Sequence, residues 1–190
     1  MRILGIMPNK TADRFTPATS VPESVGRMAE SLFGSRGLHC SQAVLLSICR
    51  HFETGLSEEH ARALTAGFGR GIGMSGCLCG AVSGAVTALG LVLGSGDAPK
   101  PDGAIRKASA ELHRRFKEAR GSTCCSVLSA QSKTLTGRRY QHCPEHTGLA
   151  AHMAAEILLE QGFAPKNSSL SRKRRPRASL LGKVAGWLLP

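Results

Sequence analysis

The chain has 190 residues, enough for one domain with a hydrophobic core but too few for two ordinary domains. A single Trp and a single Tyr argue against a nucleic-acid surface built on base stacking. The net charge is +12, but residues 166–190 hold seven Lys or Arg and no acid, so the basicity belongs largely to the C-terminal tail.

The N-terminal segment has no apolar periodicity. Residues 1–21 mix Pro, Thr, Asn and charged side chains, which predicts an irregular arm. Its first ten residues lack the apolar stretch of a secretory signal, so we expect a cytoplasmic, reducing location. In that compartment, cysteines more often bind metals or take part in redox chemistry than form structural disulfides.

Three amphipathic helices are predicted over residues 22–68. The first begins near Pro22 and ends at Gly34. The second follows Cys40, where apolar residues recur along one helical stripe. The third follows Ser57, a favoured N-cap residue, and two Glu then suit the positive end of the helix.

The next segment is uncharged. Residues 71–96 contain no Asp, Glu, Lys or Arg, which fits either a membrane span or a central buried helix. Gly76, Gly80 and Gly84 recur at every fourth position and allow close approach of neighbouring helices in both settings. Polar Ser and Thr, and the absence of interfacial aromatic residues, favour the buried helix.

Three more helices complete the predicted fold. They cover residues 101–121, 122–130 and 143–162, and no strand-like alternation of any length occurs. The predicted fold class is therefore all-α. We expect a compact bundle of about five to six helices, with a small-residue-rich central helix, in a domain of residues 22–163.

Four of the seven cysteines share one placement, because each stands at the start of a predicted helix. They are Cys40, Cys79, Cys125 and Cys143. Free N–H groups and the positive end of the helix dipole favour thiolate over thiol, so we expect lowered pKa values and good ligands or nucleophiles. If the four bind one small centre, their sulfurs should lie within roughly 4–7 Å of one another.

Other residues near these four are weaker candidates. Cys77 and Cys124 each neighbour a stronger one and are expected as spare ligands or resolving thiols, so the functional member of each pair stays open. His39 and His142 directly precede candidate cysteines and would serve as ligands or proton relays, or lie in exposed loops. Cys49 falls in the middle of an apolar helical stripe and is predicted to be a core residue.

Three functions fit this pattern. The first is a redox or electron-transfer protein whose four thiolates hold an iron–sulfur cluster or another soft metal, with an unidentified oxidoreductase as partner. The second is a metal-free thiol–disulfide protein or sensor in which neighbouring pairs such as Cys77/Cys79 or Cys124/Cys125 react. The third is a structural zinc protein or binding module, although paired C-x-x-C motifs are absent from the sequence. An oligomer is compatible with each.

The same residues resemble the C-GCAxxG-C-C family over roughly residues 24–162. The resemblance rests on a glycine-rich approach, AGFGRGIGMSG, and on four cysteine motifs: HCSQAVL at Cys40, CGAVSGA at Cys79 with signature glycines Gly80 and Gly84, a Cys after a Gly-Ser turn at Cys125, and CPEH at Cys143. It implies a compact helical domain with redox activity. It supplies no substrate.

A literal G-x-G-x-x-G is formed by Gly71, Gly73 and Gly76, with Asp97 about 20 residues further on, as in a dinucleotide fingerprint. The preceding segment is predicted to be helical rather than a strand, which argues against a dinucleotide site. These glycines are better explained as letting the backbone pass close to the cysteines and donate N–H groups to sulfur.

The C-terminal tail, residues 164–190, joins a basic run to a short amphipathic helix. A disordered solubilising tail is the slightly favoured interpretation. The alternative is that residues 172–190 contact an anionic membrane surface and make the protein peripheral to the membrane. Nucleic-acid binding by the same run is less favoured.

Overall fold

The computed structural model describes residues 20–96, 99–130 and 140–166. Seven α-helices lie in these ranges: α1 (Val21–Leu32), α2 (Cys40–His51), α3 (Glu58–Thr65), α4 (Gly80–Gly94), α5 (Asp102–Arg120), α6 (Cys125–Ala130) and α7 (Cys143–Glu160). Over the described ranges the only β-type pairing is an isolated bridge between Leu78 and Cys124. The predicted all-α bundle is confirmed, with seven α-helices instead of five to six.

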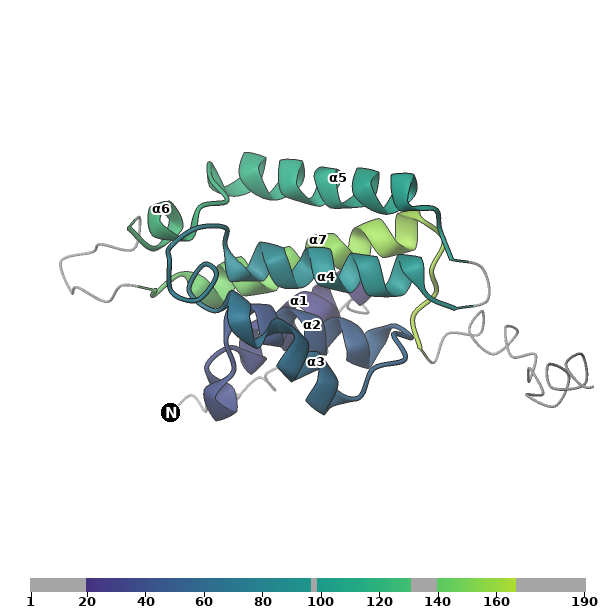
Figure 1. Ribbon diagram of the computed structural model, residues 1–190, viewed down its shortest axis with the longest axis horizontal. Helices are drawn as coiled ribbons and strands as arrows, with labels where there is room; N and C mark the ends of the chain where they lie inside the picture. Colours follow the sequence, from purple (N-terminus) through teal and green to yellow (C-terminus); the bar gives the residue numbers. More distant parts are fainter. Residues whose placement is uncertain (1–19, 97–98, 131–139, 167–190) are drawn as a thin grey trace, which may run out of the picture.

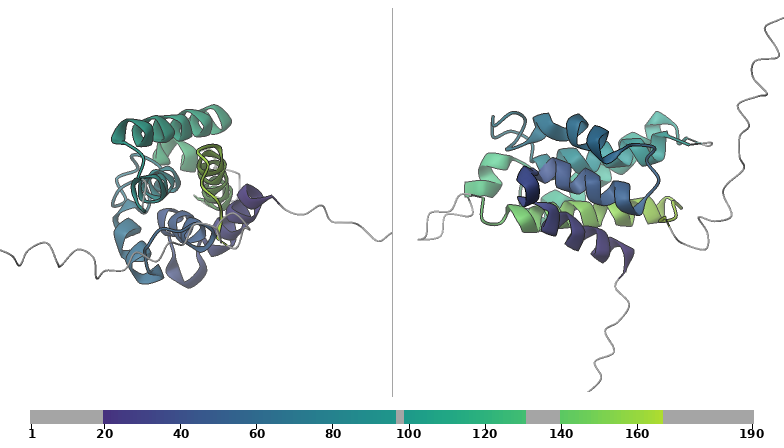
Figure 2. Two further views of the ribbon diagram at one scale, coloured as in Figure 1. Left: turned by 90° about the vertical axis from the view of Figure 1, so that its right-hand side faces the viewer. Right: turned by 90° about the horizontal axis from the view of Figure 1, so that it is seen from below.

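The helices form three layers. Helices α4 and α7 lie in the middle, with α5 on one side and α1, α2 and α3 on the other (Figure 1). The end-on view shows α5 crossing over the middle layer (Figure 2). Most of the uncharged segment forms the central helix α4, which packs against α2, α5 and α7. Among the described helices, none has both the length and the hydropathy needed to cross a bilayer.

Several helix starts are fixed by local sequence. Ser20 caps α1, accepting a hydrogen bond from the Glu23 N–H while the Glu23 carboxylate accepts one from the Ser20 N–H. Ser57 caps α3, as predicted, and accepts a hydrogen bond from the His60 N–H. The arm before Ser20 and the tail segment 172–190 lie outside the described residues.

Glycines let the helices approach closely in two places. A Cβ built on Gly26 of α1 would lie 3.0 Å from the carbonyl oxygen of Gly148 in α7. A Cβ built on Gly84 of α4 would lie 2.5 Å from the carbonyl oxygen of Ser41 in α2. Side chains at these positions would force the helices apart. The close α2–α4 approach agrees with the expectation for Gly84, whereas Gly76 lies in the loop before α4 and not in a helix.

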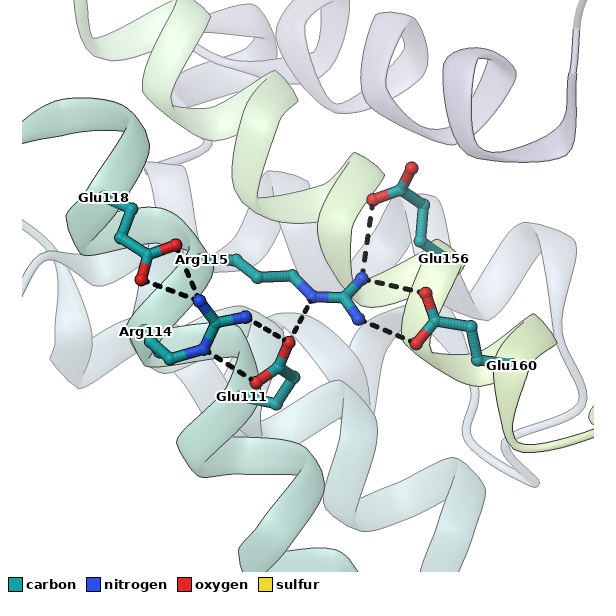
Figure 3. A network of polar contacts seen from close by, with 6 residues as sticks. All are labelled: Glu111, Arg114, Arg115, Glu118, Glu156 and Glu160. Atoms are coloured by element: carbon teal, nitrogen blue, oxygen red, sulfur yellow. Dashed lines mark hydrogen bonds and ion pairs between the residues drawn. The ribbon is translucent and has the colours of Figure 1, made fainter.

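Ion pairs and ring contacts attach α5 to α7. The Arg115 guanidinium lies 2.8 Å from a carboxylate oxygen of Glu160 and 2.7 Å from one of Glu111 (Figure 3). Nearer the C-terminal end of α5, the ring of Phe116 meets the ring of His146 edge to face, with 6.2 Å between centroids. The last turn of α5 therefore lies over the beginning of α7.

Candidate functional site

The four candidate cysteines stand at four helix starts. Cys40, Cys125 and Cys143 are the first residues of α2, α6 and α7, and Cys79 is the N-cap of α4. Helices α4 and α7 both begin at the end of the bundle where α6 lies (Figure 1). The predicted placement at helix starts is confirmed for all four.

Electrostatic effects between the thiols indicate that these helix starts lie near one another. The pKa of Cys79 is raised by Cys40 and Cys125, and that of Cys143 by Cys79 and Cys125. Cys143 and Cys125 in turn raise the pKa of Cys40. Every pair among the four therefore interacts, although they come from sequence positions up to about 100 residues apart.

The pKa values themselves differ from the sequence prediction. Burial, with a contribution from the neighbouring thiols, raises the pKa of Cys40 to about 11 and those of Cys79 and Cys143 to about 12. Backbone N–H groups oppose this rise, those of Ala81 and Val82 acting on Cys79. The expected lowering was wrong for these three because desolvation outweighs the helix-start N–H groups.

Gly80 leaves room for the sulfur of Cys40. A Cβ at Gly80 would lie 2.6 Å from the Cys40 Sγ and 2.6 Å from the Phe68 carbonyl oxygen. The glycine that follows Cys79 therefore brings the start of α4 against the start of α2. This contact gives a physical reason for the signature glycine.

The glycine-rich loop between α3 and α4 forms one wall of the site. The backbone N–H of Arg70 lowers the pKa of Cys40, while the Arg70 guanidinium lies over the ring of Tyr140, 5.2 Å from its centroid. A Cβ built on Gly71 would lie 2.7 Å from the Cβ of Cys125. The prediction that these glycines bring backbone close to the cysteines is confirmed, and no strand precedes them in the described part of the chain.

Backbone strain is concentrated in this loop. Arg70, Ile72 and Met74 have φ values of 53°, 55° and 69°, in the left-handed region that non-glycine residues rarely adopt. The loop is held by backbone hydrogen bonds, including that from the Cys77 N–H to the Gly71 carbonyl. Strained backbone of this kind is found preferentially at functional sites.

The bridge between Leu78 and Cys124 separates Cys124 from Cys125, whereas Cys77 and Cys79 share a face. The Cys125 N–H donates to the Cys77 carbonyl at 2.6 Å and the Cys79 N–H donates to the Thr123 carbonyl at 2.8 Å, so Cys77 lies across from Cys125. Side chains alternate along extended chain, which places Cys124 on the face away from Cys79 and Cys125. Its thiol donates instead to the Gly76 carbonyl at 3.3 Å.

The remaining sequence candidates have separate environments. The ring of His39 packs on Gly69, where an added Cβ would lie 3.1 Å from it, and the His142 ring lies 3.4 Å from a carboxylate oxygen of Glu145. Their role as ligands or relays stays a prediction. Cys49 lies in the core, 5% exposed, and its sulfur accepts a hydrogen bond from the Thr54 hydroxyl.

Sequence reasoning missed His146. It lies one turn into α7 after Cys143 and is buried, with neither ring nitrogen hydrogen-bonded among the described residues. The motif Cys-Pro-Glu-His carries the signal, because residues three apart share a helix face.

The donor set suits a soft metal, but the sulfurs are not arranged around one. In the described ranges, no three Cys, His, Asp or Glu side chains are grouped as metal ligands. Four buried thiols are nevertheless the chemistry that selects zinc, cuprous copper or iron–sulfur clusters. Burial and mutual repulsion disfavour the thiolates, and a bound cation removes both penalties.

The raised thiol pKa values predict an alkaline loss of stability. In the folded protein, the pKa values of Cys40, Cys79 and Cys143 lie above 9.0, the ordinary value that the unfolded chain should show. Between pH 9 and the raised values, the folded state binds more protons than the unfolded state, so the free energy of unfolding falls as pH rises. Urea denaturation of metal-free, reduced protein should show this fall above pH 9.

Other groups also titrate in this range, so a variant is needed as reference. Cys40→Ala/Cys79→Ala removes two of the three thiols and should give a shallower decline between pH 9 and pH 11. Equal slopes for variant and wild type would contradict the assignment.

Relief of strain at Ile72 should stabilise the protein. Ile72 is β-branched, has a φ of 55° and is 48% exposed, so Ile72→Gly removes a left-handed conformation that costs about 1–2 kcal/mol and loses little burial. Part of this gain is offset by the greater freedom of glycine in the unfolded chain. We expect the free energy of unfolding to rise by about 1 kcal/mol in urea titrations. A decrease would show that the Ile72 side chain makes a stabilising contact.

Comparison with known proteins identifies a family. A model for the family described as "Putative redox-active protein (C_GCAxxG_C_C)" matches residues 38–157, which include all four cysteines at helix starts. This is the family that the cysteine motifs resemble. No curated protein and no solved structure matches the chain.

Proposed function

The chain belongs to the C_GCAxxG_C_C family, whose description is that of a putative redox-active protein, and we propose that it transfers electrons through a centre bound by Cys40, Cys79, Cys125 and Cys143. The proposed centre is an iron–sulfur cluster or another thiolate-bound metal. The mutual electrostatic effect of four thiols at four helix starts carries the proposal.

The surrounding chain supports such a centre in three ways. Helix-start N–H groups at Ser41 and Ala81 stabilise negative charge on the sulfurs of Cys40 and Cys79. The glycine-rich loop brings the backbone N–H of Arg70 to Cys40, and hydrogen bonds to sulfur tune the potential of such centres. Burial of Cys79 and Cys125, 6% and 8% exposed, keeps water from the site.

Binding requires the four cysteines to be grouped as ligands of one centre, which they are not in the described ranges, and it requires their protons to leave. An iron–sulfur cluster would supply one-electron transfer. The protein's own part is to position the thiols and to direct backbone N–H groups at the sulfurs of Cys40 and Cys79. Because the pKa values of three thiols are raised, metal affinity should increase with pH.

The partner and location remain part of this proposal. We propose an oxidoreductase as electron donor or acceptor, in a reducing cytoplasmic setting. Contact of residues 172–190 with a membrane surface belongs to the same proposal and concerns residues outside the described ranges.

A metal-free thiol–disulfide protein is the second candidate, and the position of Cys77 favours it. Cys77 is exposed and lies across the bridge from Cys125. Formation of a Cys77–Cys125 disulfide would release two electrons and two protons, which reduce a partner disulfide to two thiols. The raised pKa values of Cys40, Cys79 and Cys143 weigh against these three as attacking groups, since thiolate is the reactive form.

Anaerobic purification of the full chain, followed by visible absorption spectroscopy and analysis for iron, sulfide and zinc, separates the candidates. Colour with stoichiometric iron and sulfide supports the proposed centre. A colourless, metal-free protein with a Cys77–Cys125 disulfide after mild oxidation supports the second candidate, and stoichiometric zinc without redox activity supports a structural zinc module. Either of the last two results overturns the electron-transfer proposal.

A further inference from the structure

A hollow of about 330 Å³ lies where the end of α5 meets the beginning of α7. Its lining consists of Ala119, Arg120, His142, Glu145 and His146. His142 directly precedes Cys143, so the hollow flanks the cysteine site. Its volume is at the lower end of the range for small-molecule sites.

Two polar side chains that line this hollow have buried nitrogen atoms without a hydrogen-bond partner in the described part of the chain. His146 is 5% exposed, and neither Nδ1 nor Nε2 of its ring is hydrogen-bonded in the described part of the chain. The Nε of Arg120 is likewise buried and unpartnered, and no described carboxylate forms an ion pair with Arg120. Unpaired buried polar groups are costly and rare, and a bound ligand is one way to satisfy them.

The charges in the hollow define what would bind. Burial and the nearby Arg120 guanidinium lower the pKa of His146 to about 4, so its ring is neutral near pH 7 and still offers one N–H. Glu145 is exposed and pairs with His142 at 3.4 Å. Arg120 thus forms no ion pair with a described carboxylate and lies beside a neutral donor, while the Glu145 carboxylate, which also lines the hollow, contacts His142.

We propose that this hollow binds a small oxyanion, which accepts hydrogen bonds from the Arg120 guanidinium and the His146 ring. A guanidinium with an adjacent donor matches the geometry of a carboxylate, sulfite or phosphate group. The site goes beyond the proposed electron transfer and does not depend on a metal at the cysteines. It would hold an anionic substrate or regulator next to Cys143.

Isothermal titration of the full-length, reduced protein with acetate, sulfite and phosphate tests the proposal. We expect saturable binding of at least one of the three probes, the preferred probe identifying the oxyanion class. His146→Phe keeps an aromatic ring against Phe116 but removes both ring nitrogens, and Arg120→Gln removes the positive charge. Each should weaken binding about tenfold or more, as loss of a hydrogen bond to a charged group predicts.

Arg106→Gln is the matched control, because Arg106 is an exposed arginine near the other end of the same helix. Its affinity for the probe should equal that of the wild type. No binding of any probe, or equal weakening by Arg106→Gln and Arg120→Gln, would overturn the proposal. A His146→Phe protein that is more stable, combined with a wild type that binds none of the probes, would show that the hollow holds water only.

Metal analysis of the same samples separates this site from the proposed centre. Saturable binding to metal-free protein supports the oxyanion site even where the electron-transfer proposal fails. A metal-loaded wild type that binds no probe overturns the oxyanion site alone.

Discussion

Replacement of Cys79 by Ser is expected to abolish the proposed centre while leaving the fold intact. Ser is a favoured N-cap residue, so the start of α4 is kept. Its hydroxyl cannot replace a soft thiolate, and loss of one ligand should lower metal affinity by more than about 100-fold, beyond the 10- to 100-fold range typical of outer-shell changes. Metal-to-protein ratios and visible absorbance after anaerobic purification measure the effect.

Cys124→Ser and Cys49→Ser are the matched controls for this experiment. Cys124 faces the carbonyl of Gly76 and Cys49 lies in the core, so neither change should lower metal content. If Cys124→Ser loses as much metal as Cys79→Ser, Cys124 rather than Cys125 belongs to the site, and the assignment is wrong. Circular dichroism of each variant separates loss of ligand from loss of fold.

Placement of the cysteines was predictable because it depends on local sequence. Helix starts are marked by residues such as Ser57, and the start at Cys40 follows the short loop after Gly34. The start at Cys143 is marked by Pro144, because proline is favoured at the first helical position. The gathering of these starts at one end of the bundle depends on how α2, α4 and α7 pack. Their shared placement at helix starts was the reason to expect that the four cysteines would meet, and no residue spacing in the sequence specified how the helices bring them together.

The titration of the thiols could not be predicted from local sequence. A helix start favours thiolate wherever it occurs, but the burial of Cys79 results from packing by segments distant in the chain. His146 shows the same limit, because its unpartnered ring depends on Phe116 and Arg120 of α5. Likewise, the left-handed backbone at Ile72 follows from the fold of the whole loop, since an isoleucine gives no local sign of it.

Gly84→Ala should cause the largest loss of stability among the single changes considered. A Cβ at this position would lie 2.5 Å from the carbonyl oxygen of Ser41 and 2.8 Å from its Cα, and backbone cannot move aside as a side-chain end can. Helices α2 and α4 must therefore separate, and the core between them loses contact. Overpacking of this kind costs about 1–3 kcal/mol or more, against a helix-propensity gain of up to about 1 kcal/mol.

We therefore expect Gly84→Ala to lower the free energy of unfolding by about 2 kcal/mol or more, measured by urea denaturation. Gly90→Ala is the control in the same helix, because a Cβ there meets no atom within 4 Å and should stabilise the protein by about 0.5–1 kcal/mol. Ser41 directly follows Cys40, so separation of the helices should also withdraw Cys40 from the other thiols. Reduced metal content in Gly84→Ala, with normal content in Gly90→Ala, would link the packing of α2 against α4 to the cysteine site. Equal stability of the two variants would contradict the predicted overpacking at Gly84.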